Sequence, residues 1–404
     1  MKALLLRDLR LATRAGGGFG LSLAFFLILA LGDRGEAQIP QAGAGATLPG
    51  VPNRLTNADF ECESGGYYEA INSRGKTIQI PNAWTMVANG DVPDMKSARV
   101  WVVKSCDISS SKHVEKISGY DSFFVAALDL ETPPTPGKPF DVSIYQQVEA
   151  APGVAYSLSG WQLTLCGGSN TVPKNDCPTG YYMAKMLGID PTGGTDPNSP
   201  NVVWGENRNN FVDANNQRIG WSNVRTSALA QADKITVFAR INSPFQWHGN
   251  HGFMDALALV QAPLATLGVT TSTLESGFGV NVKLAWDGSL GPDIPTISGG
   301  NYQPQYDVQY WHAANNAWRD LQDGAPGAGS MDFAARCAGD YQFRVRTRAE
   351  QPQGTGSWPN QRFPGVWSEP QVVTVPQNTD GGPAPLPEGA ARLYMPVLSV
   401  WGGC

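Results

Sequence analysis

One stretch in the middle of the chain, residues 139–166, limits the choice of fold more than any other. Apolar and polar residues alternate over 142–148, which is the period-two pattern of a strand with one buried face. Pro152-Gly153 then predicts a tight turn, because proline fixes φ and glycine accepts a positive φ. Residues 154–165 are rich in β-branched, aromatic and serine residues and predict a second strand. We therefore expect a hairpin of two long antiparallel strands at the centre of a β-sandwich.

The length and composition of the chain extend this expectation to the whole molecule. With 404 residues the chain exceeds what one hydrophobic core usually serves, so we expect two domains. Glycine (46) and proline (30) are abundant and charged residues make up only 16%, which favours short strands joined by turns. Roughly ten apolar runs of strand composition precede residue 262, enough for two packed sheets. The predicted fold class is all-β.

Charge and motifs argue against two classes of function. The net charge of −6 argues against nucleic acid as a partner, because phosphates need a basic face. The sequence contains no GxSxG, no HExxH and no P-loop. Its acidic residues form no recognisable pair for glycoside hydrolysis. We expect a protein that is not an enzyme, and a hydrolase of unrecognised type is the weaker alternative.

The N-terminus has the features of a targeting signal. Basic residues within the first 14 positions precede an uncharged stretch whose apolar centre is Leu21–Leu31. This centre is short against the about 20 residues of a membrane span, and small residues precede a plausible cleavage after Ala37. We expect residues 1–37 to be a signal peptide, residues 38–54 a flexible lead-in, and the mature chain to be secreted or held at the cell surface. An uncleaved anchor is the alternative, because the basic region is long; no second membrane span follows.

Export makes the cysteines candidates for disulfides. Cys166 and Cys177 flank a polar loop, and closing it would stabilise the fold by ~3 kcal/mol in the chain-entropy model. Cys62 and Cys106 are the next candidate pair, since both fall in the first domain. No Cys/His spacing points to zinc or to redox chemistry.

Four motifs in the first half of the chain occur in a fixed order. They are NADFE (57–61), YQQVEAAPGVAYSLSGW (145–161), GIDPTGG (188–194) and HGFMDALALV (251–260). By this order residues 55–262 resemble carbohydrate-binding-module-like jelly rolls of the galactose-binding-like superfamily. The resemblance implies a two-sheet jelly-roll β-sandwich with a concave face that often holds glycan.

The same resemblance implies a structural calcium ion between the first and last strands of the domain. The positions that match its carboxylates are Glu61 and Asp255. Many members of the superfamily have two adjacent acids at the second position, where this chain has Met254-Asp255. Calcium, where bound, would be structural and not catalytic.

Tryptophans are the candidate sugar-binding residues, because an indole stacks on the C–H face of a sugar ring. Burial in the core is the ordinary alternative for each of them. Trp204 and Trp247 lie beside polar turns, and Trp161 lies on the central strand, where it would line the concave face or fill the core. The other tryptophans of this domain are Trp84, Trp101 and Trp221.

His248, Asn250 and His251 form a polar cluster just before Asp255. A zinc site would need further ligands that the sequence does not supply. Hydrogen bonds that brace a glycine-containing loop are the favoured interpretation.

Residues 263–376 contain four further runs of strand composition, 280–288, 305–311, 339–349 and 366–375, and apolar residues alternate in the first three. In this order the runs resemble strands B, C, F and G of a fibronectin type III domain. Trp286 matches the core tryptophan of strand B, and Tyr341 the tyrosine that ties down the E–F corner. The segment between strands B and C, 287–304, is longer than this family has, and we expect an extended loop with a role of its own. The basic ladder of strand F is expected to stack on an outer-face tryptophan, and the residues concerned are Arg344, Arg346 and Arg348 with Trp358 or Trp367.

Residues 377–404 are a proline- and glycine-rich linker followed by a short apolar tail. The tail is too short to span a membrane, and we interpret it as a strand added to a sheet edge or as a sorting tag. Cys404 in the tail pairs with Cys337 or both stay free.

The sequence favours an exported surface protein whose jelly roll binds a polysaccharide or envelope glycan and whose second domain is a spacer. The alternative is a structural or adhesive subunit, in which sandwich edges and the C-terminal strand contact other surface proteins.

Overall fold

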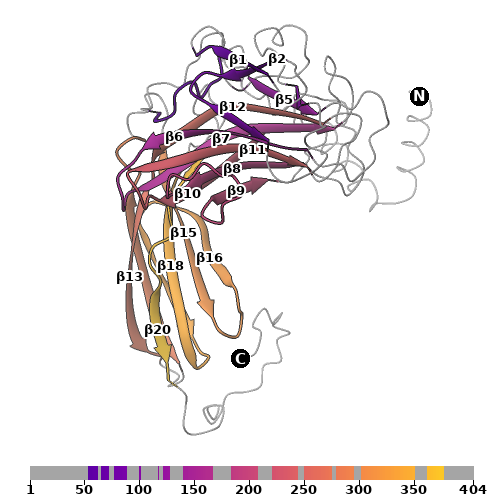
Figure 1. Ribbon diagram of the computed structural model, residues 1–404. Coiled ribbons are helices and arrows are strands. Elements are labelled where there is room, and N and C mark those ends of the chain that lie inside the picture. Colours follow the sequence, from indigo (N-terminus) through magenta and orange to yellow (C-terminus); the bar gives the residue numbers. More distant parts are fainter. Residues whose placement is uncertain are drawn as a thin grey trace, which may run out of the picture. The chain divides into compact units, whose positions relative to one another are not determined.

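A computed structural model of the protein describes thirteen stretches of the chain, all within one compact unit, 42–404. They are residues 53–61, 65–71, 77–88, 100–101, 117, 122–127, 140–166, 183–207, 221–243, 250–274, 279–294, 302–350 and 362–376. All regular secondary structure in these stretches is β-strand, so the fold is all-β, as predicted (Figure 1). Among the described residues no helix is long and apolar enough to cross a membrane. The predicted signal peptide (1–37) and C-terminal tail (377–404) lie outside these residues.

The first half of the chain forms two five-stranded antiparallel sheets and a small hairpin. One sheet, called sheet I here, has the order β10 (Ser222–Leu229), β7 (Ala155–Cys166), β12 (Asn250–Gln261), β5 (Phe123–Ala127) and β4 (Val100–Trp101). The other, sheet II, has the order β3 (Thr85–Ala88), β6 (Phe140–Glu149), β11 (Lys234–Ser243), β8 (Ala184–Asp190) and β9 (Val203–Asn207). The hairpin pairs β1 (Tyr67–Ile71) with β2 (Thr77–Pro81).

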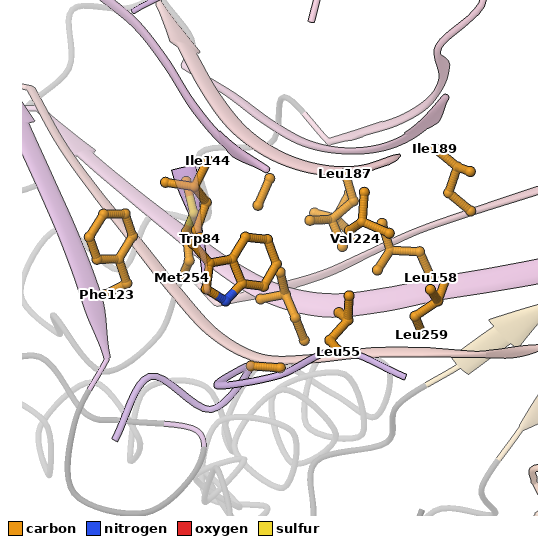
Figure 2. Packing of buried hydrophobic residues seen from close by; sticks show 14 of the residues in the cluster. Leu55, Trp84, Phe123, Ile144, Leu158, Leu187, Ile189, Val224, Met254 and Leu259 are labelled. Atoms are coloured by element: carbon orange, nitrogen blue, oxygen red, sulfur yellow. The ribbon is translucent and has the colours of Figure 1, made fainter. Parts of the chain in front are cut away.

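Apolar side chains from both sheets form the core of this sandwich. Figure 2 shows part of it, with Ile144 and Leu187 of sheet II and Leu158 and Met254 of sheet I. Burying each such side chain contributes about 1.5–3 kcal/mol. The alternation predicted for 142–148 is confirmed, because Val142 and Ile144 belong to the core. The outer face of sheet II therefore receives the intervening polar and aromatic residues of β6.

The predicted hairpin is wrong, although its turn is correct. Gly153 has φ of 81° as expected, but β6 pairs with β3 and β11 while β7 pairs with β10 and β12. The turn therefore carries the chain from sheet II to sheet I. The connection from β10 to β11 crosses in the opposite direction, from sheet I back to sheet II. The two turns are bonded to each other, because Gly153 N–H donates to Ala230 O (2.8 Å). Almost every residue of β7 is buried, which suits a strand in the middle of a covered sheet and not one half of an exposed hairpin.

The NADFE motif (57–61) does not form a strand. Asn57 and Phe60 have φ of 50° and 55°, in the left-handed region, so this segment cannot follow strand geometry. It instead attaches to β12, where Leu257 N–H donates to Ala58 O (2.9 Å). Phe60 is then buried, with its ring centroid 5.7 Å from that of Trp84.

The second half of the chain forms another sandwich. One sheet has the order β13 (Leu264–Thr273), β14 (Val280–Ser289) and β17 (Gly329–Ala335). The other has β16 (Trp318–Pro326), β15 (Gln303–His312), β18 (Gly339–Glu350) and β19 (Arg362–Pro364), with β20 (Gln371–Val375) also paired to β18. The runs predicted as strands at 280–288, 305–311 and 339–349 are confirmed. Of the run 366–375, only the second half is strand.

Two residues of this sandwich lie as the predicted resemblance implies. Trp286 is buried in the core together with Tyr306 and Phe343. The hydroxyl of Tyr341 accepts a hydrogen bond from Cys337 N–H (3.1 Å), just before β18. The buried position raises the pKa of Tyr341.

A third, small apolar cluster contains residues of both sandwiches. Ala258 and Val260 of β12 pack with Ile294, Ala349 and Phe363. Polar contacts accompany this junction. They are the ion pair of Arg54 Nε with Asp293 Oδ2 (3.0 Å), the bond from Gln261 N–H to the same oxygen (2.7 Å), and the bond from Ser227 Oγ to Gly365 O (3.0 Å). The described part of the long segment 287–304 thus contacts the first sandwich through Asp293 and Ile294.

Candidate functional site

A row of aromatic side chains crosses the outer face of sheet II. Strand register places Tyr145, Phe238, Gly188 and Trp204 side by side on β6, β11, β8 and β9. The ring centroid of Phe238 lies 5.9 Å from that of Tyr145 and 5.9 Å from that of Trp204. The guanidinium of Arg240 lies over the Trp204 ring, 5.5 Å from its centroid. Within the row Phe238 is fully buried, whereas Tyr145 and Trp204 are half-buried.

The indole of Trp204 occupies space that only a glycine at position 188 leaves open. A Cβ on Gly188 would lie 2.7 Å from both Cε3 and Cζ3 of the indole. The six-membered ring therefore rests directly against the backbone of β8. This close approach orients the indole and places it beside Phe238, with the two ring planes inclined at 44°.

A polar network lies next to the aromatic row. Arg240 Nε donates to Asp141 Oδ1 (2.8 Å) and Arg240 Nη2 to Asp141 Oδ2. Asn242 Nδ2 donates to Asp141 Oδ2 (2.8 Å). The loop after β8 completes the set, because Arg240 also donates to Pro197 O (3.1 Å) and Asn198 Oδ1 (3.3 Å). Both members of the ion pair are largely withdrawn from solvent, which strengthens their interaction.

The loop 191–201 is held against this face by the GIDPTGG turn. The backbone N–H and the hydroxyl of Thr192 both donate to Asp190 Oδ1 (2.8 and 2.6 Å), which forms an Asx-type turn. Gly193 takes φ of 77°, and its carbonyl accepts a bond from Gln147 Nε2 of β6 (2.8 Å). The turn therefore directs the loop back over sheet II, where it reaches Arg240.

The structure separates the predicted sugar-binding tryptophans. Trp204 belongs to the aromatic row, whereas Trp161 lies on β7 in sheet I, opposite Asn223 and Asp255 in register. The two are therefore on different sheets and do not line one groove. Trp247 lies outside the described residues. Of the remaining tryptophans in this sandwich, Trp84 and Trp221 are buried and the side chain of Trp101 is not described.

Four residues of the site were not predicted: Asp141, Tyr145, Phe238 and Arg240. Asp141 and Tyr145 stand on the polar side of the alternation in β6, which placed them on the outer face from the sequence. Arg240 has the same phase in β11. Their meeting depends on the pairing of β6 with β11, which nothing in the sequence pattern indicated.

The two predicted calcium ligands are related through strand β12. Glu61 ends the segment that attaches to β12 through Ala58, and Asp255 lies on β12 at an irregularity where Ala256 takes φ of 50°. Asp255 is fully buried, and its Oδ2 accepts a bond from Ile117 N–H (2.8 Å). Carboxylates with backbone carbonyls are the hard oxygen ligands that calcium prefers, so the donor types fit. Within the described residues, no group of three or more His, Cys, Asp and Glu side chains gathers as a metal site.

The predicted placement of the histidine cluster in a loop is wrong for its described members. Asn250 and His251 begin strand β12 and are fully buried. Asn250 Nδ2 donates to Ser243 Oγ (3.1 Å) between sheets I and II. His248 lies outside the described residues.

Cys166 and Cys337 each take part in a disulfide bond. The alternative that Cys337 stays free is therefore wrong. The pairings with Cys177 and Cys404, and the pair of Cys62 with Cys106, stay predictions because those four residues lie outside the described stretches.

One buried cation faces the interior of the first sandwich. Lys185 of β8 is 1% exposed and pairs in register with Ile241, a core residue, so both point between the sheets. Burial lowers its pKa to about 8. Beside it Gln162 of sheet I donates across the interior to Met186 O of sheet II (3.1 Å).

The arginine ladder of the second sandwich stacks on tryptophans, as predicted. Arg344 lies 3.9 Å from the ring centroid of Trp318 and 4.4 Å from that of Trp367, and Arg346 lies 4.6 Å from Trp367. Trp318 was not predicted, and Trp358 is outside the described residues. Arg348 instead forms ion pairs, with Asp307, Asp323 and Glu350.

Comparisons with known proteins give short or distant similarities. No family model matches the chain. Heme exporter protein B of Paracoccus denitrificans is 90% identical over 29 residues, and that of Rhodobacter capsulatus is 83% identical over 29 residues. Each match covers 7% of this chain, and the chain spans only 13% of the length of these curated relatives.

Similar solved structures include TmCBM61 in complex with beta-1,4-galactotriose, at 17% identity, 52% coverage of this chain, 98% of that chain and a TM-score of 0.28. The adhesin domain of Epf from Streptococcus pyogenes follows at 9% identity, with 81% and 97% coverage and a TM-score of 0.21. Tailspike protein 4 of bacteriophage CBA120 matches at 10% identity, with 52% and 21% coverage and a TM-score of 0.26. TM-scores this low carry no conclusion about function.

Proposed function

We propose that the protein is an exported, non-catalytic binding protein that holds a glycan on the outer face of sheet II. The observation that supports this most directly is the position of Trp204, whose half-buried indole rests on Gly188 beside Phe238. A sugar ring offers a C–H face that stacks on such an indole. The adjacent Asn198 and Asn242, which are exposed and half-buried, supply the few polar groups that orient a ligand.

The outer face of sheet I is the less suitable surface, even though it carries Trp161. Ala258 and Val260 on that face pack against the second sandwich, and Ser227 of β10 bonds to Gly365. A glycan there would compete with contacts inside the molecule. Sheet II is therefore our choice for the binding face.

The second sandwich, residues 263–376, is proposed to be a fibronectin type III domain that supports the binding sandwich of residues 55–262. The sheet orders β13-β14-β17 and β16-β15-β18-β19, with β20 on β18, support this assignment. The bond of Cys337 N–H to the Tyr341 hydroxyl supports it further, because this family ties down its E–F corner through such a tyrosine.

A structural calcium ion held by Glu61 and Asp255 is part of the proposal. Its support is the attachment of the Glu61 segment to the β12 irregularity that carries Asp255. Chelation should lower the melting temperature of the purified chain, and Asp255→Asn should abolish the difference. An unchanged melting curve with and without chelator would contradict a calcium site.

Export is proposed to depend on residues 1–37, with cleavage after Ala37 and a retained anchor as the alternative. The 29-residue similarity to heme exporter protein B transfers no heme-related role, because it spans 13% of that protein. Amino-terminal sequencing of the protein recovered from producing cells distinguishes the two fates.

The glycan-binding proposal is tested on an array of immobilised oligosaccharides with the full mature chain and calcium present. Trp204→Ala should abolish saturable binding while the far-UV spectrum stays unchanged. Trp161→Ala is the matched control, a half-buried tryptophan on the other sheet, and should retain binding. Loss in Trp161→Ala alone would move the site to sheet I.

A second candidate function is assembly through strand edges, as in a structural or adhesive subunit. In the described part of the chain β13 pairs only with β14, and β20 only with β18, so each has a free edge. Leu264 (50% exposed) and Val372 (59% exposed) leave apolar surface on these strands. A blank array together with concentration-dependent self-association, abolished by Val372→Lys, would favour this function.

A further inference from the structure

We infer that the binding face selects neutral glycans and that Asp141 sets this selectivity by occupying the guanidinium of Arg240. The inference rests on the proposed function and names the class of glycan that the same face would take. The property in question is the charge of the glycan, which separates neutral sugars from those that carry carboxylate or sulfate groups.

The donors of Arg240 are nearly all used within the protein. A guanidinium has five N–H groups, and four hydrogen bonds engage them. Two of these bonds go to Asp141, one to Pro197 O and one to Asn198 Oδ1. The strong recognition of a ligand carboxylate or sulfate by arginine uses two parallel N–H groups, and Arg240 has no such pair to offer.

Asp141 keeps the guanidinium of Arg240 engaged within the protein. The carboxylate accepts two bonds from Arg240 and one from Asn242, and it is buried. Drawing Arg240 away toward a ligand would leave a buried carboxylate without its counter-charge, which is strongly unfavourable. An anionic sugar would therefore have to break this ion pair before it could use the arginine.

The remaining charges on the outer face of sheet II also disfavour anions. Lys234 forms an ion pair with Glu149 (3.3 Å), so this second cation is shared with a carboxylate. In the described strands of this face, acids outnumber bases. The acids are Asp141, Glu149, Asp190 and Glu206, and the bases are Lys234 and Arg240.

Long-range electrostatics act in the same direction. The chain carries a net charge of −6, which repels a polyanion before contact at low ionic strength. A neutral glycan meets no such barrier. Its hydroxyls can donate to the exposed acids Glu149 and Glu206 and accept from the amides of Asn198 and Asn242, while a ring face stacks on Trp204.

The test is affinity electrophoresis of the full mature chain through gels that contain neutral polysaccharides (galactan, mannan, xylan) or acidic ones (polygalacturonate, alginate, a sulfated galactan). At least one neutral polymer should retard the chain, and the acidic polymers should retard it at least ten-fold less. Asp141→Asn keeps the size of the side chain and one acceptor but frees the charge of Arg240. This variant should gain retardation by an acidic polymer, and added salt should weaken the gain.

Two control variants separate the role of Asp141 from net charge. Glu149→Gln makes the same change in charge on the same face but frees the ammonium of Lys234 and not the guanidinium of Arg240. It should gain less than Asp141→Asn, because an ammonium lacks the paired N–H groups of a guanidinium. Asp141→Asn combined with Arg240→Gln should lose the gain. A circular dichroism melt establishes that each variant is folded.

The outcomes distinguish the inference from the proposed function. Retardation of the unaltered chain by acidic polymers as strong as by neutral ones overturns the inference and leaves glycan binding intact. A folded Asp141→Asn variant that gains no acidic ligand overturns the role of Asp141. No retardation by any polymer overturns both proposals. The comparison on the unaltered chain decides the neutral preference even where Asp141→Asn does not fold.

Discussion

Trp204 and Gly188 are neighbours on adjacent strands of sheet II, and the indole of the first rests on the bare backbone of the second. The contact is close enough that a Cβ on residue 188 would lie 2.7 Å from two atoms of the six-membered ring. The orientation of the proposed sugar-stacking surface is thus a property of the pair, and the glycine is as much a part of the site as the tryptophan.

Gly188→Ala should therefore displace Trp204 and abolish glycan retardation. Overpacking of this kind costs about 1–3 kcal/mol of stability, so the variant should still fold. Affinity electrophoresis and a denaturation curve measure the two effects. Gly268→Ala is the matched control, because its Cβ would meet nothing closer than 3.7 Å, and it should leave binding unchanged. Equal binding by Gly188→Ala and the unaltered chain would remove Trp204 from the site.

Local patterns predicted the strands of the second sandwich well. Val282, Leu284 and Trp286 are all buried in its core, and the alternation that indicated this lies within five consecutive residues. Short-range periodicity reports which face of a strand is buried, so this result needs no distant partner. The corner position of Tyr341 was instead implied by the resemblance to fibronectin type III domains, and its hydroxyl accepts from Cys337 N–H, four residues upstream.

The candidate site could not be predicted in the same way, because its partners are far apart in the chain. Asp141 and Arg240 are separated by 99 positions and meet only through the pairing of β6 with β11. The turn at Pro152-Gly153 suits a hairpin and a crossing between sheets equally well. The pattern around the turn does not distinguish them, so the sequence predicted the residues of the outer face without their neighbours.

Because the side chain of Lys185 is buried, we expect the stability of the fold to depend on pH. Burial lowers its pKa from 10.5 to about 8, so between these values the folded chain binds fewer protons than the unfolded chain. The free energy of unfolding should therefore rise with pH across this window, by roughly 2 kcal/mol between pH 8 and 9.5. Urea denaturation at the two pH values measures the change. Lys185→Met should remove the rise, whereas an unchanged slope in that variant would assign the effect to other groups.

Tyr341 predicts a loss of stability on removal of a single oxygen. In Tyr341→Phe the backbone N–H of Cys337 loses its acceptor, which should cost about 1–3 kcal/mol. Chemical denaturation of the full chain measures this loss. Tyr310→Phe is the matched control, because its hydroxyl makes only a long contact with Asn315 Nδ2 (3.5 Å), and it should change stability by no more than about 0.5 kcal/mol. Equal effects would show that the corner bond contributes little.

The bonds of Asp293 lead us to expect that the two sandwiches unfold together. Its carboxylate accepts from Arg54 and from Gln261 N–H, beside the apolar cluster of Ile294 and Phe363. Asp293→Ala leaves that backbone N–H without its acceptor and should lower the stability of the junction by about 1–3 kcal/mol. Calorimetry should show one transition for the unaltered chain and two for the variant. Asp323→Ala is the control, since its ion pair with Arg348 is exposed at the rim and should be worth about 0–1 kcal/mol. Two transitions already in the unaltered chain would mean that the second sandwich acts as a loosely joined spacer, and that the junction does not restrict access to the outer face of sheet I.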